Sequence, residues 1–252
     1  TTLPDPRSLF LGFQYNLAKL PDEPMRPRVA DARVGFFTVS RFDYSDTRTL
    51  TPRINLVKRW RLEKKDPAAE ISEPKQPIVF WIDRNVPLRY RDTIVAGVLE
   101  WNKAFERIGF KDAVQARIQP DDADFDTLDA RHASIRWMTT ARPAFGGIGP
   151  SQADPRTGEI LDADIGIDPT RLRFARYRLA DSSTPSTAPA SSPLGFPQGD
   201  AHDCRIEDFV AEDRGFASEL LAARGVIAPD SPQAEEFVLS DLKEVTMHEV
   251  GH

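Results

Sequence analysis

The middle of the chain alternates short apolar runs with one long amphipathic stretch, and this order restricts the fold more than any other feature. Residues 77–83 (PIVFWID) form a compact apolar run typical of a buried strand. Residues 88–110 follow, and Gly109 stands where a helix C-terminus is expected. The apolar side chains of this stretch are spaced three and four apart, as on one face of a helix: Ile94, Val98, Trp101, Phe105 and Ile108. Residues 113–120 and 133–140 indicate two more strands. Together these elements predict an α/β (α+β) layer in which the helix, at about 89–108, packs on a mostly parallel sheet.

A hairpin signal follows the predicted layer strands. DPRTG at 154–158 supplies the turn. After the turn, apolar residues alternate with acidic ones up to Asp168, which predicts a strand near 160–167 with one apolar and one acidic face. The glycine-rich run before the turn suits an antiparallel edge strand near 147–152, which another backbone approaches closely. We therefore expect a twisted, mostly parallel five-stranded sheet with an antiparallel edge.

The chain divides into two unequal parts. Residues 1–72 contain short apolar runs interrupted by Pro and charge, with a strand signal at 34–42, and predict an extended, β-rich region from a preceding domain and linker. Residues 73–252 hold the α/β layer. A Ser/Pro-rich stretch at 181–200 lacks the apolar side chains to bury itself and predicts a flexible insertion. Residues 203–225 are expected to be helical in part.

Composition excludes some classes of function. The net charge of −6 argues against nucleic acid as a partner. Cys204 is the only cysteine, so no disulfide can form within the chain, and no apolar run approaches the roughly 20 residues that span a membrane. The opening TTLPDPRSLF has no signal-peptide pattern, and the last residues stop inside a motif. The sequence favours an internal fragment of a longer protein and leaves its oligomeric state open.

The final helix carries the clearest chemical signal. Ser231 and Pro232 predict its start, as an N-cap followed by Pro at the first helical position. It ends in His-Glu-x-x-His, where His248 and His252 fall on one face and can point two ring nitrogens at one zinc ion. Glu249 is rotated by about 100° from His248 and can take a proton from a zinc-bound water. The alternative is a solvent-facing helix end with two incidental histidines.

Other polar residues are weaker candidates. His132 and His202 are single histidines in loops, where polar surface or turn roles are favoured over metal ligation. Asp241 and Glu244 lie one or two turns before His248 and could orient a ligating imidazole, but a solvated helix face is favoured for both.

The order of these motifs resembles that of the bacterial zinc-dependent metalloproteases of metzincin type. It is most similar to the large secreted or envelope-associated proteins that carry a domain of uncharacterised function before the protease. The resemblance covers about residues 30–252. It is carried by RLEKKDP (61–67), EISEPKQPIVFWID (70–83), EWNKAFERIGFKDA (100–113), IRW (135–137), DPRTGEI (154–160) and HEVGH (248–252).

The resemblance implies an endopeptidase in which residues 73–252 form a metzincin-like N-terminal subdomain, the first half of the catalytic domain, with two long helices. His248 and His252 would be zinc ligands, and Glu249 would be the general base that activates a zinc-bound water to hydrolyse peptide bonds. The third protein ligand of the family, a histidine six residues after the second, would lie beyond His252. An extended peptide or protein substrate would pair with the edge strand by β-augmentation. The substrate-binding residues would be Gly147, Ile148, Gly149, Pro150 and Ser151.

The same resemblance implies a secreted, periplasmic or envelope-associated location. With two ligands only, we expect the 252-residue chain to bind zinc poorly, to fray at its last helical turn and to hydrolyse no peptide bonds. Two alternatives stay open. One is a non-catalytic envelope module that keeps the protease fold and binds a protein partner, and the other is a different metal hydrolase with its third ligand elsewhere.

Overall fold

The computed structural model of the protein describes most of the N-terminal region, the sheet and the long helices. The predicted insertion at 181–200 lies outside the described residues except for Asp181, and so does His202. Within the stretch 203–225, residues 216–217 and 220–221 are described as helical. The described residues are 12–45, 47–50, 52–139, 146–181, 216–217, 220–221, 224–228 and 231–252.

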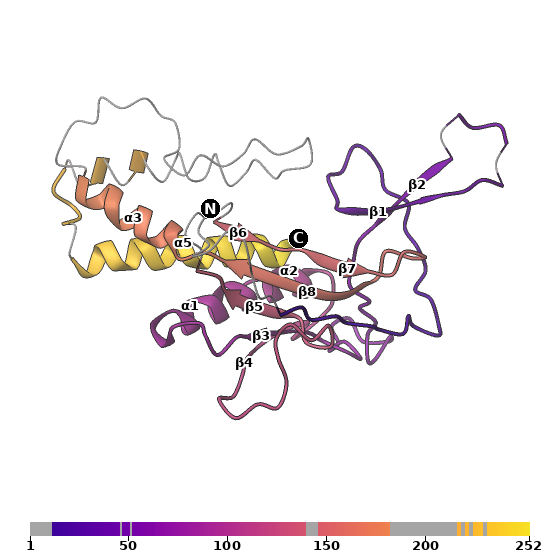
Figure 1. The fold of residues 1–252 in the computed structure, drawn as a ribbon, viewed down its shortest axis with the longest axis horizontal. Coiled ribbons are helices and arrows are strands. Elements are labelled where there is room, and N and C mark those ends of the chain that lie inside the picture. The colour runs from indigo at the N-terminus through magenta and orange to yellow at the C-terminus, as the bar shows by residue number, and fades with distance from the viewer. Residues whose placement is uncertain are drawn as a thin grey trace.

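Four parallel strands make up most of the sheet, and the apolar runs of the sequence form them. They are β3 (Ile78–Ile82), β4 (Val114–Ile118), β5 (Ser134–Trp137) and β8 (Ile160–Ile167). β3 pairs with β4 and β5, and β5 pairs with β8, all in parallel. The order across the sheet is β4-β3-β5-β8-β6 (Figure 1). The chain is thus mixed α/β with a mostly parallel sheet, as the sequence predicts.

The edge of the sheet is antiparallel, but it is interrupted. β6 (Gly147–Ile148) and β7 (Ser151–Ala153) both pair with β8, so the sheet counts six strands where five were predicted. Both strands pair with β8 in the same register, with Ile148 opposite Gly166 and Ser151 opposite Ala163. Pro150 lies between them and has no N–H to donate to the ladder. Its carbonyl still accepts from the Asp164 amide at 3.2 Å, so β6 and β7 form one edge with a gap.

The predicted helix at 89–108 is two helices, α1 (Leu88–Leu99) and α2 (Asn102–Arg107). At the junction the Lys103 and Ala104 amides donate to carbonyls only three residues back, a tighter 3₁₀ pattern. The Trp101 indole donates to the Met247 carbonyl at 2.7 Å, which ties the junction to the C-terminal helix. Gly109 ends α2 with a positive φ of 87°, as predicted.

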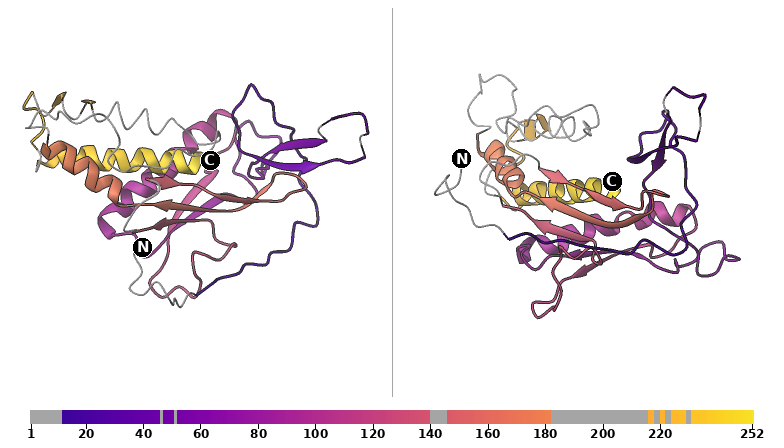
Figure 2. Two further views of the ribbon diagram at one scale, coloured as in Figure 1. Left: turned by 45° about the horizontal axis from the view of Figure 1, so that its top comes forward. Right: turned by 45° about the vertical axis from the view of Figure 1, so that its right-hand side comes forward.

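Helix α5 (Pro232–Gly251) begins where the sequence predicts. The Ser231 side chain accepts from the Ala234 amide at 3.2 Å, and Pro232 is the first helical residue. Its apolar face is fully buried at Val238 and Leu242. α5 packs on α1 and on strands β6 and β8, which confirms the prediction that it lies beneath the edge strand (Figure 2). None of the described helices combines the length and apolar character that crossing a lipid bilayer requires.

One helix was not predicted. α3 (Thr170–Asp181) starts after Asp168, whose carboxylate accepts from the Thr170 amide at 2.8 Å. It packs against α5 and makes two ion pairs with it. Arg171 bonds Asp241, and Arg176 bonds Glu235. The Asp-Pro pair at 168–169 is a usable helix-start signal.

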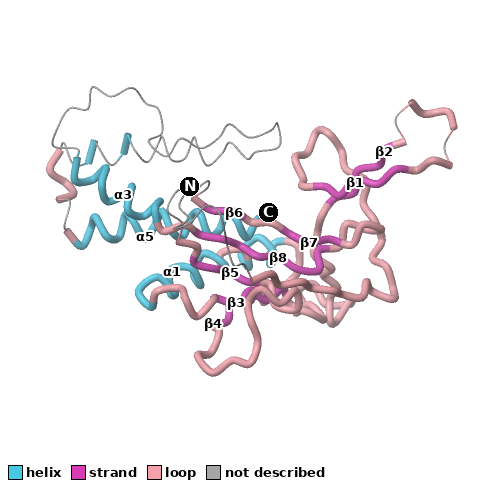
Figure 3. The backbone as a smooth tube through the Cα atoms, viewed as in Figure 1, coloured by secondary structure: helices cyan, strands magenta, loops and turns pink. Residues whose placement is uncertain are grey.

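The N-terminal region is extended and lies largely outside the layer, as predicted. Its strands β1 (Thr38–Phe42) and β2 (Arg53–Val57) form an antiparallel hairpin. Figure 3 shows that the rest of the region is mostly loop, and that the hairpin projects away from the sheet. The division of the chain into domains at residue 72 stays a prediction.

Candidate metal centre and the edge strand beside it

The two histidines of the motif lie together at the end of α5. The His248 and His252 Nε2 atoms are 3.0 Å apart, and the rings are nearly perpendicular, with centroids separated by 4.6 Å. The helix continues to Gly251, and the His252 amide still donates to the Glu249 carbonyl at 3.3 Å. The last turn is helical in the structure, and its fraying stays a prediction. The two Nε2 atoms thus face the same point in space.

The surroundings of His252 keep its ring neutral. Burial lowers the pKa of His252 to about 4, and the charge of His248 adds to the effect. At neutral pH His252 is therefore uncharged, and the neutral imidazole is the form that donates a lone pair to a metal. The two rings thus fit the ligand pair of a zinc site. Across the described residues, no group of three or more His, Cys, Asp or Glu gathers to hold a metal, so the pair is a two-ligand arrangement.

Glu249 lies under the edge strand. Its side chain is only 4% exposed. A Cβ at Gly147 would lie 2.7 Å from the Glu249 Oε1, and one at Gly149 would lie 2.7 Å from the Glu249 carbonyl oxygen. A larger residue at Gly149 would therefore clash with the helix backbone, and one at Gly147 would displace the side chains of Glu249 and Val245. The predicted close backbone approach at this glycine run is therefore confirmed, and what approaches is the helix turn that carries Glu249.

The five predicted substrate-binding residues all lie along this edge, but in different settings. Gly147 and Ile148 form β6, and Ile148 points outward with 42% exposure. Gly149 and Pro150 form the gap in the edge. The Ser151 carbonyl is already engaged, because the Lys58 ammonium donates to it at 3.1 Å. The structure thus brings the predicted edge residues next to Glu249, and their role in substrate binding stays a prediction.

Two residues of the N-terminal region reach this site, and neither was predicted to lie there. Phe37 packs edge-on against the His252 ring, with centroids 4.5 Å apart. Lys58 reaches Ser151 from just beyond β2. The aromatic pair Phe36-Phe37 was the only local signal, and nothing in it indicates which ring meets the histidine.

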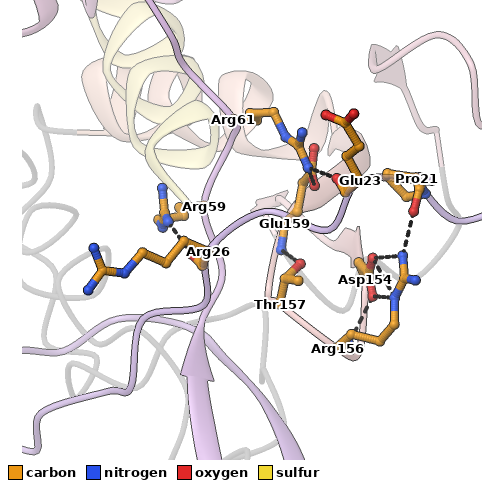
Figure 4. Close-up of polar contacts among 9 residues, drawn as sticks. All are labelled: Pro21, Glu23, Arg26, Arg59, Arg61, Asp154, Arg156, Thr157 and Glu159. Carbon is orange, nitrogen blue, oxygen red and sulfur yellow. Dashed lines mark hydrogen bonds and ion pairs between the residues drawn. The ribbon is translucent and has the colours of Figure 1, made fainter.

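Arginine contacts hold this region in place beside the turn between β7 and β8 (Figure 4). Arg61 donates to the Glu159 carboxylate at 2.6 Å and to the Glu23 carbonyl at 2.7 Å. From the turn itself, Arg156 donates to the Pro21 carbonyl at 2.8 Å. Arg59 donates to a carbonyl within the region, that of Arg26, at 2.6 Å. These bonds position the chain that carries Phe37 and Lys58.

The weaker candidates take other roles. Asp241 is 6% exposed and accepts two bonds from Arg171, at 2.9 and 3.1 Å, so the predicted solvated face is wrong at this position. The reason is α3, which covers that side of α5. His132 is half-buried in a turn, with its ring stacked on Phe125 at 4.1 Å between centroids. Glu244 is half-buried on α5.

Comparison with known proteins gives one partial match. The profile of a family described as Domain of unknown function (DUF5117) matches residues 5–65. The matched segment is the N-terminal region that contributes Phe37 and Lys58, and it stops before the α/β layer. Searches of the curated proteins and of the solved structures found no match.

Proposed function

We propose that this chain belongs to a zinc-dependent endopeptidase of metzincin type and contributes part of its catalytic centre. The observation that carries the proposal is the convergence of the His248 and His252 Nε2 atoms at 3.0 Å. Two nitrogens that bind one tetrahedral zinc at about 2.0–2.1 Å are roughly 3.3 Å apart. The pair therefore has close to the span that a shared zinc ion requires.

The residues divide the chemistry between them. His248 and His252 would hold the zinc, together with the third ligand that the resemblance assigns to residues following His252. Bound zinc supplies Lewis acidity, which polarises a peptide carbonyl and lowers the pKa of water. Glu249 would accept the proton of the attacking water and deliver it to the leaving amine. Its burial beneath Gly147 and Gly149 holds the carboxylate still at that point.

The edge strand supports the same proposal. β6 has its outer side unpaired among the described strands, and an extended peptide could add to it antiparallel or parallel through main-chain bonds. A peptide held there would run past Glu249. The substrate class would then be unstructured polypeptide, because main-chain pairing at an edge requires an extended chain. The proposal carries with it a secreted, periplasmic or envelope-associated location.

The partial family match also supports the proposal. The resemblance is to proteins in which a domain of uncharacterised function precedes the protease. Residues 5–65, which match a domain of unknown function, precede the α/β layer here.

The test compares zinc content after dialysis with cleavage of an unstructured protein. We expect the 252-residue chain to bind zinc weakly and to cleave nothing, and the same chain extended past His252 to do both. In the extended form Glu249→Gln should retain zinc and lose hydrolysis, whereas His248→Ala should lose both. Glu236→Gln, the same change at an exposed position of α5, is the matched control and should alter neither.

Two outcomes would overturn the proposal. An extended form without bound metal would favour the non-catalytic interaction module. Full hydrolysis by Glu249→Gln would remove Glu249 from the chemistry.

A further inference from the structure

A pocket of about 200 Å³ lies at the carboxyl end of β5, far from the histidine pair. The ends of α1 and β5, the residues just after β5, and α3 line it, with no acidic residue among Arg89, Arg173, Arg176, Tyr90, Trp137 and Thr139. Arg176 bonds Glu235 near the start of α5, fourteen positions before Glu249. At 1.5 Å per helical residue, the pocket is about 20 Å along α5 from the candidate metal centre.

The positive charge in this pocket is only partly compensated. Arg176 is neutralised by the Glu235 carboxylate, with contacts of 2.8 and 3.1 Å, and it also lies 3.3 Å from the Tyr90 hydroxyl. Arg89 stacks on the Tyr90 ring, 4.6 Å from its centroid. Neither Arg89 nor Arg173 makes an ion pair with any residue that the structure describes. Two guanidinium groups therefore line the pocket without a carboxylate partner among the described residues.

The backbone adds to this positive field. α1 starts at Leu88 after Pro87, which lines the pocket, and no side chain caps its N-terminus. The first turn of α1 also has no acidic residue. Unpaired amides and the positive end of the helix dipole favour an anion at that place.

The floor of the pocket is aromatic. The Tyr90 and Trp137 rings are stacked, with centroids 5.1 Å apart and planes inclined by 24°. Trp137 is the last residue of β5, and in open α/β sheets ligands bind beyond the carboxyl ends of the parallel strands. The pocket thus combines aromatic side chains with guanidinium donors, and small-molecule sites commonly join apolar walls with a few polar groups.

We propose that this pocket binds a phosphate-type dianion, either free phosphate or the phosphate group of a small phosphomonoester. Two uncompensated guanidinium groups match two negative charges, and their planar forks match phosphate oxygens in pairs. A single carboxylate would leave one charge uncompensated. The volume suits a small ligand and excludes a peptide. This site is independent of the proposed hydrolysis.

Titration of inorganic phosphate into the 252-residue chain tests the site, with ionic strength held constant by chloride. Calorimetry and tryptophan fluorescence, through Trp137, should both report saturable binding. Arg89→Gln and Arg173→Gln should each weaken phosphate binding by about tenfold or more, since each removes one charged guanidinium group. Arg107→Gln, a change at an exposed arginine of α2 outside the pocket, should leave binding unchanged. The melting temperatures of all three variants should equal that of the wild-type chain, which separates lost binding from lost folding.

Phenyl phosphate distinguishes the two sources of the anion. Tighter binding than inorganic phosphate would assign the aromatic platform to the organic part of a phosphomonoester, and equal binding would assign the pocket to the free ion. Three results would overturn the proposal: no saturation below about 10 mM phosphate, equal weakening by Arg107→Gln, or acetate binding as tightly as phosphate.

Discussion

The α/β layer and the N-terminal region are held by different forces. In the layer, large apolar side chains such as Phe80, Ile94 and Leu242 are almost fully buried. Among the apolar side chains that the structure describes in the N-terminal region, only Met25, Leu56 and Val57 are buried. Most of the described aromatic residues of that region are more than 40% exposed: Phe13, Tyr15, Phe36, Phe37, Phe42 and Tyr44. Trp60 is the exception, because it packs against the layer with its ring centroid 6.2 Å from that of Phe80.

The N-terminal region depends on directional polar contacts instead. Arg59 and Arg156 donate to backbone carbonyls, and Arg61 donates to both a carbonyl and the Glu159 carboxylate. Such bonds contribute about 0.5–3 kcal/mol each, less than a buried core residue. The candidate metal centre combines both kinds of support. Its histidines stand on the packed helix, whereas Phe37 and Lys58 reach it from the polar-anchored region.

The largest expected effect comes from the apolar core. Leu242→Ala removes a fully buried side chain from α5 and should lower the free energy of unfolding by about 2–5 kcal/mol. Leu50→Ala makes the same change at a fully exposed position of the N-terminal region and should stay within about 0.5 kcal/mol of wild type. Urea unfolding of both variants measures the difference. Similar losses in the two would mean that the N-terminal region is as tightly packed as the layer.

The second expected effect is a gain in stability, and it comes from a buried acidic residue of β8. Asp162 is 4% exposed, and burial raises its pKa to about 6, helped by the charge of Asp164. Because the pKa is higher in the folded state, folding favours the protonated form. The associated stability is complete below pH 4 and is lost as pH rises through 6. Asp162→Asn should therefore raise the free energy of unfolding by about 1–3 kcal/mol above pH 6 and leave it unchanged below pH 4.

Unfolding at several pH values gives this profile, and Asp122→Asn serves as its control at an exposed position. A gain for Asp162→Asn that is the same at pH 4 and pH 7 would show that charge is not its cause.

Loss of the Arg61–Glu159 ion pair, which holds the N-terminal region, should lower stability by less and more locally. Glu159→Gln weakens the bond to Arg61 and should cost about 1–2 kcal/mol, because the glutamate is buried and its partner keeps a charge. Hydrogen exchange should quicken at the Lys58 and Arg59 amides, which bond Phe37 and Gly158, while β3 stays protected. Glu63→Gln, in an exposed pair with Lys75, should change little. Faster exchange throughout β3 would show that the two regions unfold together.

Sequence periodicity predicted what depends on local spacing. The strands of the sheet, the Ser231 cap and the placement of His248 and His252 on one face of α5 all follow from residues close to each other in the chain. The break after α1 could not be predicted, because it accompanies a bond from Trp101 to a carbonyl 146 residues away. α3 was missed because Arg171 and Arg176 find their carboxylate partners on α5, far along the chain.

The candidate site also has a part that local sequence pattern predicts and a part that it does not. The motif residues and the glycine edge were predicted from local pattern, and their meeting at Glu249 follows from the packing of α5 under the edge strand. The approach of Lys58 to Ser151 spans 93 residues of chain and leaves no local pattern. Contacts between the two regions are the part of the site that only the folded structure supplies.

The smallest expected effect tests whether the contact between the Phe37 and His252 rings contributes to zinc affinity. The Phe37 ring meets the His252 ring edge-on at 80°, a geometry that contributes about 0.5–1.5 kcal/mol in aromatic pairs. Phe37→Ala should let the His252 ring rotate and lower zinc affinity by about two- to tenfold, measured by competition with a chelator. Phe36→Ala removes the neighbouring exposed ring, which makes no ring contact among the described residues, and should leave the affinity unchanged. Glu159→Gln should lower the affinity in the same direction as Phe37→Ala but by less, because it loosens the chain that carries the ring without removing it. Unchanged zinc affinity in Phe37→Ala would confine the metal centre to the α/β layer, and the N-terminal region would then be a neighbour of the site with no part in it.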